Sequence, residues 1–250
     1  MTGAVWAMAR IRLCVDHPLG AEQSVALTVA QAHHLFSVMR EGVGATVLVF
    51  NGRDGEWLAE VAAAGKRGGV LRCVEQRRVQ EGAADLWLLF APVKKARTDF
   101  IVEKAVELGV ARMLPVQTDF TNAERMRADK AAAHVREAAE QCGALHLAEV
   151  APLQSLAKCL AAWDPARSIL WADESGARRP SATTDLFARL APGPWAVLIG
   201  PEGGFSAGER QMLAALPFVV PLALGPRILR SETAALAALV LWQAHLGDWR

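Results

Sequence analysis

Two glycine–proline turns near the C-terminal end hold the residues best suited to chemistry. Residues 198–206 read LIGPEGGFS, and residues 222–234 read LALGPRILRSETA. Each passage predicts an apolar strand, a Gly-Pro turn and a helix start, and α/β proteins bind ligands at such carboxyl ends of parallel strands. Glycine lets a ligand lie against the backbone. We therefore expect two walls of one pocket, while tight turns without a ligand are the alternative.

The charge in the first turn restricts the kind of ligand. Neither turn matches the phosphate-binding patterns G-x-x-x-x-G-K-[ST] or G-x-G-x-x-G. Glu202 inside a phosphate cradle would repel the phosphate, so a phosphate-free ligand, such as one that carries a cation, fits better. Ser206 and Glu209 have the spacing of a capping box that opens the next helix.

Three charged residues follow the second turn: Arg227, Arg230 and Glu232. Glu232 suits the positive end of the helix that we expect to begin there, and Ser231 or Thr233 can cap that helix. The two arginines come at the mouth of the turn, where a solvated face is the alternative to a role in binding.

A basic segment, Lys94, Lys95 and Arg97, precedes a helix expected at residues 98–108 and capped by the threonine at its first position. These basic side chains suit phosphate oxygens, while a solvated basic loop is the alternative. Lys104 borders the apolar face of that helix, where a lysine needs either a route to solvent or a partner.

The elements that must position these residues change character near residues 81–82. Residues 10–80 predict a small, mostly antiparallel domain, with one helix from a Thr28–Gln31 capping box to about Arg40 and a hairpin turn at Asn51-Gly52. Beyond it, strands and helices alternate, which favours an α/β domain with a mainly parallel sheet. In the small domain, strands are expected at residues 45–50, 57–61 and 70–79. In the α/β domain, strands are expected at 86–91, 112–117, 168–172, 195–200 and 218–224, and further helices at 123–142, 153–163, 206–216 and 231–246.

Composition and charge exclude several classes of protein. The 250 residues are 52% hydrophobic and 21% charged, with a formal net charge of +1. Such a chain is globular, and it would need local basic patches to bind nucleic acid. The four cysteines form no C-x-x-C pair and no zinc pattern, which favours free thiols in a reducing compartment and no metal. We see no signal peptide, and the apolar stretch 234–246 is too short to span a membrane, so we expect a cytoplasmic protein.

The same passages carry a resemblance to a known family. Together with EKAVELGV at residues 103–110, EQC at 140–142, and HHL and VMR within 33–40, the two turns resemble the RsmE family. Its members are knotted SPOUT-class methyltransferases of uridine N3 in small-subunit ribosomal RNA. The matching passages span nearly the whole chain in the family's order. Val106 and Ser231 stand where the family often has other residues, such as threonine, without putting the chemistry in doubt.

The resemblance implies an α/β protein of two domains. A small PUA-like β-barrel domain that binds RNA is expected at residues 1–80, and a SPOUT methyltransferase domain with a trefoil knot at residues 81–250. It further implies S-adenosylmethionine as cofactor, 16S ribosomal RNA in the assembled small subunit as substrate, and a homodimer.

The resemblance and the residue chemistry together give three sets of site residues. The cofactor contacts are expected to be Ala172, Asp173, Glu174, Leu198, Ile199, Gly200, Pro201, Glu202, Gly203, Gly204, Leu222, Leu224, Gly225, Ile228, Leu229 and Arg230. The catalytic candidates are Arg230, Lys104, Glu202 and Glu232. The RNA contacts are expected to be Arg10, Arg12, His34, Arg40, Lys94, Lys95 and Arg97.

The implied reaction assigns tasks to the catalytic candidates. N3 lies on the pairing edge, so the uridine must be unpaired or flipped out, and N3 must lose its proton. A cation beside the flanking carbonyl oxygens would stabilise the anion, with Arg230 the first candidate and Lys104 the second. Glu202 could accept the proton or hold the pocket, and Glu232 could orient Arg230 or cap its helix. A methyltransferase of RNA 2′-hydroxyls and an RNA-binding ribosome-assembly factor are the alternatives.

Overall fold

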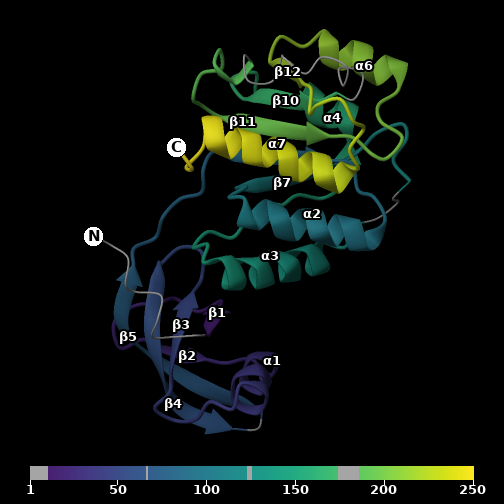
Figure 1. The fold of residues 1–250 in the computed structure, drawn as a ribbon. Helices are drawn as coiled ribbons and strands as arrows, with labels where there is room; N and C mark the ends of the chain where they lie inside the picture. Colours follow the sequence, from purple (N-terminus) through teal and green to yellow (C-terminus); the bar gives the residue numbers. More distant parts are fainter. Residues whose placement is uncertain (1–10, 66, 123–125, 174–185) are drawn as a thin grey trace. The chain divides into compact units, whose positions relative to one another are not determined.

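The computed structural model describes residues 11–65, 67–122, 126–173 and 186–250. The chain divides into two compact units, one of Met1–Gly82 with Ala139–Leu147 and one of Ala83–Ala138 with Ala148–Arg250. Figure 1 shows the elements of both units, coloured along the sequence. Among the described residues, no helix has both the length and the apolar character needed to cross a membrane.

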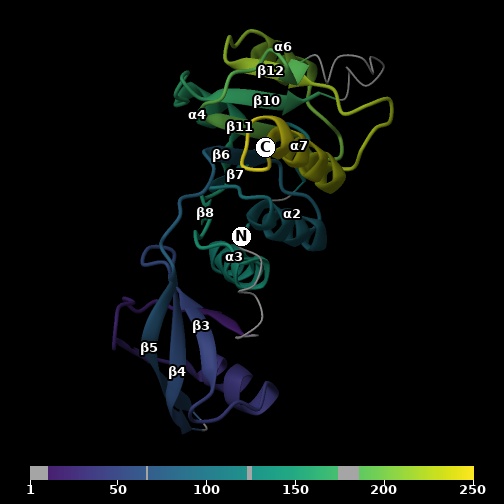
Figure 2. The same ribbon diagram turned by 60° about the vertical axis from the view of Figure 1, so that its left-hand side comes forward.

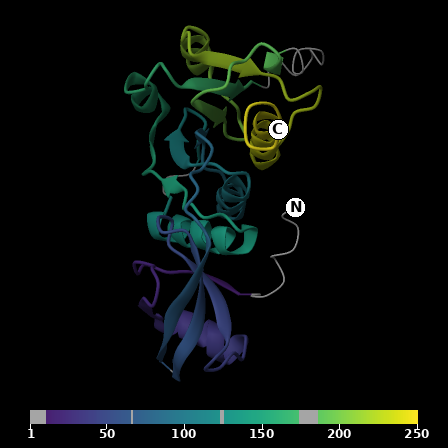
Figure 3. The same ribbon diagram turned by 90° about the vertical axis from the view of Figure 1, so that its left-hand side faces the viewer.

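The first unit is built on a five-stranded, mostly antiparallel sheet. Its strands are β1 (Arg12–Cys14), β2 (Ser24–Ala26), β3 (Thr46–Phe50), β4 (Glu56–Gly65) and β5 (Gly68–Arg78), in the order β1-β3-β4-β5-β2. Of the described strand pairs in this sheet, only β1 and β3 run parallel. The long strands β4 and β5 form a twisted ribbon (Figure 3). Alternate strand residues such as Val47, Val49, Ala59 and Val61 are fully buried in its core.

The helix expected at residues 28–40 begins as predicted but does not remain α-helical. Thr28 and Gln31 form the predicted capping box ahead of α1 (Val29–Ala32). A π-helical turn, η1 (His33–Val38), follows, in which a backbone N–H reaches five residues back along the chain. Over so few residues the spacing of apolar side chains does not distinguish this wider turn from an α-helix.

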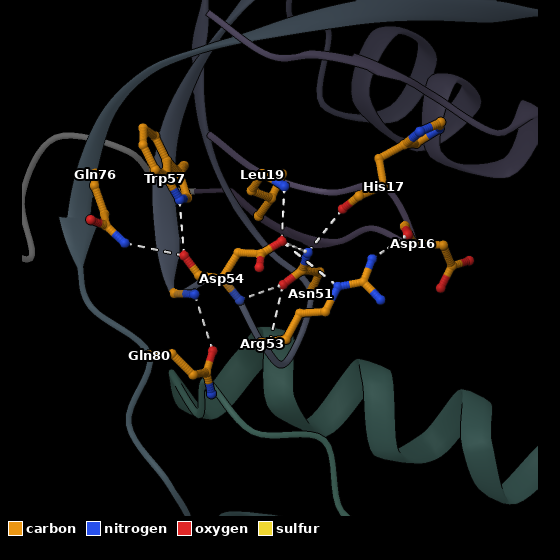
Figure 4. A network of polar contacts seen from close by, with 10 residues as sticks. Asp16, His17, Leu19, Asn51, Arg53, Asp54, Trp57, Gln76 and Gln80 are labelled. Atoms are coloured by element: carbon orange, nitrogen blue, oxygen red, sulfur yellow. Dashed lines mark hydrogen bonds and ion pairs between the residues drawn. The ribbon is translucent and has the colours of Figure 1, made fainter. Parts of the chain in front are cut away.

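The predicted turn at Asn51 and Gly52 joins β3 to β4 and is held by side chains (Figure 4). Asn51 Oδ1 accepts hydrogen bonds from the backbone N–H groups of Arg53 and Asp54, at 3.1 and 2.9 Å. The Asp54 carboxylate accepts from Asn51 Nδ2 at 2.6 Å and from the Leu19 N–H at 2.9 Å. These donors, Asn51 first, lower the pKa of Asp54 below its ordinary value.

The second unit contains the expected parallel sheet. Its strands are β6 (Leu86–Phe90), β7 (Arg112–Gln117), β8 (Glu149–Val150), β10 (Ser168–Ala172), β11 (Trp195–Ile199) and β12 (Val219–Leu222), in the order β12-β10-β11-β6-β7-β8. A further short strand, β9 (Gln154–Ser155), also pairs with β7. The described pairs are all parallel. The carboxyl ends of β10, β11 and β12 therefore meet at one edge of the sheet.

Helices cover both faces of this sheet. On one face, α2 (Lys95–Glu107) and α7 (Ser231–His245) lie side by side (Figure 1 and Figure 2). On the other, α4 (Leu156–Ala161) and α6 (Ala207–Ala214) share a core with the strands. A further helix, α3 (Ala128–Cys142), follows β7 in the chain.

Three helix starts differ from the expectation. Helix α2 begins at Lys95, because Thr98 is not a cap: its Oγ1 donates to the Val93 carbonyl oxygen and accepts from the Val93 N–H, both at 3.0 Å. Helix α3 begins at Ala128, and residues 123–125 lie outside the described part. Helix α4 is shorter than expected because the residues before it pair with β7 as β9.

Candidate active site

A cavity of about 380 Å³ lies at the carboxyl ends of β10, β11 and β12. Both Gly-Pro turns line it, so the prediction that they form two walls of one pocket is confirmed. Most of the residues expected to contact a cofactor line this cavity. They are Ala172, Asp173, Ile199, Gly200, Pro201, Glu202, Gly203, Gly204, Leu222, Leu224, Gly225, Ile228, Leu229 and Arg230. Arg227, Ser231 and Ala234 complete the lining.

Leu198 is the described residue of that expected set that does not line the cavity. It is fully buried, in the core that the strands share with α4 and α6. Because neighbouring strand residues face opposite sides, Leu198 points into this core while Ile199 reaches the cavity. Glu174 lies outside the described residues.

Ser231 ties the two turns together. Its Oγ donates a 2.9 Å hydrogen bond to the carbonyl oxygen of Gly200, and the residue is buried. This corrects the capping prediction, because the N-cap of α7 is Arg230, whose side chain makes no capping bond. The serine holds the second turn against the first instead of capping its own helix.

The glycines of the turns meet two different requirements. Gly204 and Gly225 have φ values of +69° and +98°, a left-handed backbone that favours glycine. A Cβ added at Gly225 would meet nothing within 4 Å. A Cβ added at Gly203 would lie 3.2 Å from the Cβ of Phe120, so this glycine lets the first turn lie against that ring.

Three charged side chains from three elements meet beside the cavity. Arg97 of α2 forms ion pairs with Glu202 of the first turn and with Glu232 of α7, the latter with 3.5 Å between Nε and Oε1. Glu232 Oε2 is buried and has no hydrogen-bond partner among the described residues. The single positive charge of Arg97 is therefore shared between two carboxylates. One expectation was that Glu232 orients Arg230, but its ion pair is with Arg97.

The two arginines of the second turn present cations to the cavity. Arg227 and Arg230 both line it, and both are exposed. Neither forms an ion pair with a described residue, so their charge is not neutralised within that part of the chain. Arg230 is thus placed as a catalytic or binding cation would be.

Lys104, the second catalytic candidate, is absent from the lining. Its Nζ donates to the carboxylates of Glu103 and Glu107, at 2.8 and 2.7 Å. These hydrogen bonds, Glu103 first, raise the pKa of Lys104 above its ordinary value. The two glutamates supply the partner that the position of this lysine on the helix requires.

A second cavity, of about 610 Å³, shares Pro201 and Glu202 with the first. Its lining includes Lys94, Phe120, Asn122, Arg127 and Lys130. Apart from Lys94, these residues were not among the expected contacts: Phe120 and Asn122 belong to no element expected from the sequence, and Arg127 and Lys130 fall within the helix expected at residues 123–142. Phe120, an aromatic residue among the polar residues 118–122, is the feature of the sequence that could have indicated this cavity.

Arg12, expected to contact RNA, is a structural residue of the first unit. Its guanidinium binds Glu56 at 2.7 Å and lies 4.3 Å from the centre of the Phe50 ring. It also donates to the carbonyl oxygens of Ala139, Glu140 and Ala144. The side chain is only 9% exposed. This corrects the expectation that it is available to RNA.

The other expected RNA contacts are more open. His34, Arg40 and Lys94 are exposed. Arg97 is engaged by the two glutamates described above. Arg10 and the side chain of Lys95 lie outside the described part of the structure.

The chain is similar to curated proteins along most of its length. The ribosomal RNA small subunit methyltransferase E of Rickettsia conorii is 28% identical over 211 residues, which cover 83% of this chain and 84% of that protein. The protein of the same name from Buchnera aphidicola subsp. Schizaphis graminum is 26% identical over 249 residues, covering 95% and 97%.

Two solved structures have the same fold. A putative methyltransferase from Legionella pneumophila, in complex with the bound cofactor SAM, is 26% identical with a TM-score of 0.79, covering 94% of this chain and 97% of that one. The ribosomal RNA small subunit methyltransferase E of Neisseria gonorrhoeae, bound to S-adenosyl methionine, is 24% identical with a TM-score of 0.86, covering 96% and 99%.

Two family models match consecutive parts of the chain. Residues 27–72 match the RNA methyltransferase PUA domain, and residues 80–243 match the RNA methyltransferase domain. These matches, with the curated relatives, confirm the resemblance carried by the two turns. Because the second match spans well over half of the chain, the protein belongs to the RNA methyltransferase family that includes the ribosomal RNA small subunit methyltransferases E.

Proposed function

We propose that the protein transfers a methyl group from S-adenosylmethionine to N3 of a uridine in 16S ribosomal RNA. The observation that carries the proposal is the cavity between the two Gly-Pro turns, which the Ser231–Gly200 hydrogen bond joins. The names of the curated relatives support ribosomal RNA of the small subunit as the substrate.

The lining of this cavity suits S-adenosylmethionine. Its volume of about 380 Å³ lies in the usual range for small-molecule sites, roughly 300–1,000 Å³. Its lining carries charges of both signs: the cations of Arg227 and Arg230, and the carboxylates of Asp173 and Glu202, which are ion-paired with Arg210 and Arg97. Such a mixed lining suits S-adenosylmethionine, which carries a sulfonium, an ammonium and a carboxylate group. Apolar side chains such as Ile199, Leu222 and Leu224 suit the adenosine. When bound, S-adenosylmethionine supplies an electrophilic methyl group.

The charged residues then have distinct tasks in the proposed reaction. The exposed Arg230 stabilises the anion that forms when uridine N3 loses its proton. Glu202, on the wall common to both cavities, either accepts that proton or holds the pocket. Glu232, with one oxygen buried, orients Arg97 and does not touch the substrate.

Several further features of the protein belong to the proposal. The N-terminal PUA-like domain is proposed to bind RNA, with His34 and Arg40 among its contacts. The trefoil knot and the homodimer remain predictions from the resemblance, and the cytoplasmic location remains a prediction from the sequence. The assembled small subunit, in preference to naked 16S RNA, is the proposed substrate.

Two measurements test the function. Calorimetry with S-adenosylmethionine and the purified full chain measures cofactor binding. Methyl transfer is then assayed on small ribosomal subunits and on naked 16S RNA, and the modified nucleotide is mapped by nuclease digestion and mass spectrometry. The proposal expects binding and a single methyl group on uridine N3.

Other results would replace the proposal with a specific alternative. A methyl group on a ribose oxygen would make the protein a 2′-hydroxyl methyltransferase. A folded protein that binds RNA but not S-adenosylmethionine would be a ribosome-assembly factor without methyltransferase activity.

A further inference from the structure

The second cavity adjoins the first through a common wall. Pro201 and Glu202 belong to both linings, and the second cavity, at about 610 Å³, is the larger. A group transferred out of the first cavity across this wall would enter the second. The position of the second cavity is therefore that of a co-substrate site.

Phe120 presents an open aromatic surface inside this cavity. The residue lines the cavity and is 48% exposed. On one side it lies against Gly203, where an added Cβ would come within 3.2 Å of the Phe120 Cβ. Exposing so much of an aromatic ring leaves apolar surface in water that a planar ligand could cover.

The backbone next to Phe120 is held by hydrogen bonds on either side of this residue. The Thr121 hydroxyl accepts a hydrogen bond from the Thr118 N–H at 2.9 Å, which joins the two ends of the turn formed by residues 118–121. The neighbouring Asp119 is held by α6 and its N-cap: Glu209 Oε1 accepts from the Asp119 N–H at 2.9 Å, and Ser206 Oγ donates to the Asp119 carboxylate at 2.5 Å. An exposed ring on so restrained a backbone is preorganised for binding.

Glu209 links this loop to the wall of the first cavity. The residue is 9% exposed, and its second carboxylate oxygen accepts from the Ser206 N–H at 2.9 Å. Ser206 belongs to the same Gly-Pro turn as Gly203 and Glu202. The turn that lines the first cavity therefore also helps to hold the backbone that carries Phe120.

The other groups in the lining suit a nucleotide. Lys94 and Lys130 contribute ammonium groups, Arg127 a guanidinium, and Asn122 an amide that can both donate and accept hydrogen bonds. Proteins that bind single-stranded nucleic acid combine such basic groups, which meet the backbone, with aromatic rings on which bases stack.

We propose that this cavity takes the target pyrimidine nucleotide, with its base stacked on Phe120. The inference rests on the proposed function and adds the place of the substrate to it. Lys94 and Lys130 meet the phosphates on either side of the base. The pairing edge of the base faces Glu202 on the common wall, where N3 is to be methylated.

The test compares short single-stranded RNAs with a central uridine or a central abasic site. Their dissociation constants are measured for the full chain and for Phe120→Ala, Phe120→Trp and Phe100→Ala. Phe100→Ala is the matched control, because Phe100 is an exposed ring of α2 that lines neither cavity. The affinity for S-adenosylmethionine and the thermal unfolding of each variant are measured in parallel.

We expect Phe120→Ala to weaken binding of the uridine RNA by roughly 5- to 150-fold, the range for one stacked base. Its binding of the abasic RNA and of S-adenosylmethionine should not change, and Phe120→Trp should restore the uridine preference. Equal binding of both RNAs by the wild type, or equal losses on both in Phe120→Ala, would overturn the inference. Failure of the wild type to bind S-adenosylmethionine would instead overturn the proposed function.

Discussion

The hydroxyl of Ser231 donates a 2.9 Å hydrogen bond to the carbonyl oxygen of Gly200. The two residues lie at the end of one Gly-Pro turn and the start of the other, 31 positions apart in the chain. Their bond fixes the start of α7 against the end of β11, so it sets the separation of the two walls of the first cavity. Ser231 was predicted as a possible cap of α7, but its side chain instead joins the two walls of the first cavity.

Replacing this hydroxyl should therefore loosen the cofactor site. We expect Ser231→Ala to lower the free energy of unfolding by about 1 kcal/mol, because the half-buried Gly200 carbonyl oxygen loses its partner. Affinity for S-adenosylmethionine, measured by calorimetry, should fall by about fivefold for the same reason. Thr233→Ala is the control, since Thr233 is exposed in the same helical turn. Equal losses of stability and of affinity in Ser231→Ala and Thr233→Ala would show that the Ser231–Gly200 hydrogen bond does not support the site.

The elements that the sequence predicted well are those with strong local signals. The parallel strands read as continuous apolar runs because both faces of the sheet are covered by helices. The capping boxes at Thr28 and Ser206 were also correct. Strands β8 and β9 were missed because each has two residues, too few to show a pattern.

The parts of the site that lie within one short turn were predicted from the sequence. The parts formed by residues far apart in the chain were missed. Glycine and proline mark both turns locally, so nearly all the expected lining residues were found. The ion pair of Arg97 with Glu202 joins residues 105 positions apart, and no local pattern encodes such a meeting. The same holds for the segment Ala139–Leu147, which packs with the N-terminal unit.

A side chain added inside the first cavity should block the cofactor. Ala234 lines the cavity from α7, and leucine is almost as good a helix former as alanine. We expect Ala234→Leu to weaken S-adenosylmethionine binding by about 2–3 kcal/mol, through overpacking, with the fold retained. Calorimetry measures the affinity, with the exposed Thr233→Leu as control. Unchanged affinity in Ala234→Leu would place the cofactor elsewhere.

Gly203 is a less direct target for the same purpose. A side chain there would first meet Phe120, with 3.2 Å between the two Cβ atoms. A bulky substitution would therefore disturb the second cavity together with the first. Ala234→Leu separates the two effects.

Arg230 should act on the chemical step more than on cofactor binding. We expect Arg230→Ala to lower the rate of methyl transfer by about 10²-fold or more, as the loss of a charge-stabilising donor does. Affinity for S-adenosylmethionine should change much less. Arg227→Ala, at the other exposed arginine of the lining, is the comparison. Transfer at nearly the wild-type rate in Arg230→Ala would leave this arginine a structural role only.

The turn between β3 and β4 should contribute stability that depends on pH. Asp54 has a pKa lowered from an ordinary value of 3.8, so its contribution is present above about pH 4 and lost as pH falls through the folded-state pKa. At neutral pH we expect Asp54→Ala to lower the free energy of unfolding by about 1 kcal/mol, because its hydrogen bonds are removed.

Thermal unfolding at neutral and acidic pH checks this expectation. The difference between wild type and Asp54→Ala should shrink as the pH falls below about 4, through the lowered folded-state pKa of Asp54. Asp129→Ala is the control, because that carboxylate is 65% exposed and such surface pairs contribute little. A difference that stays constant with pH would mean that the charge of Asp54 plays no part.

RNA binding should depend on local cations, because the net charge of the chain is only +1. Point variants test this better than deletion of residues 1–80, since Arg12 holds the carbonyl oxygens of Ala139 and Glu140 in the same unit. Arg40 is exposed and has φ +61°, so Arg40→Asn removes the charge and tolerates the left-handed backbone.

Removing one cation that meets an RNA phosphate should reduce the slope of log K against log salt by about 0.7–0.9. We therefore expect Arg40→Asn and Lys94→Ala each to flatten the salt dependence of RNA binding by roughly that amount. Arg72→Gln is the matched control, because Arg72 is held by Glu22 and Glu60 at 3.0 and 3.2 Å. The slopes come from RNA titrations at several salt concentrations. If all three variants flatten the slope equally, the RNA senses total charge and not these positions, and the proposed RNA-binding roles of Arg40 and Lys94 are wrong.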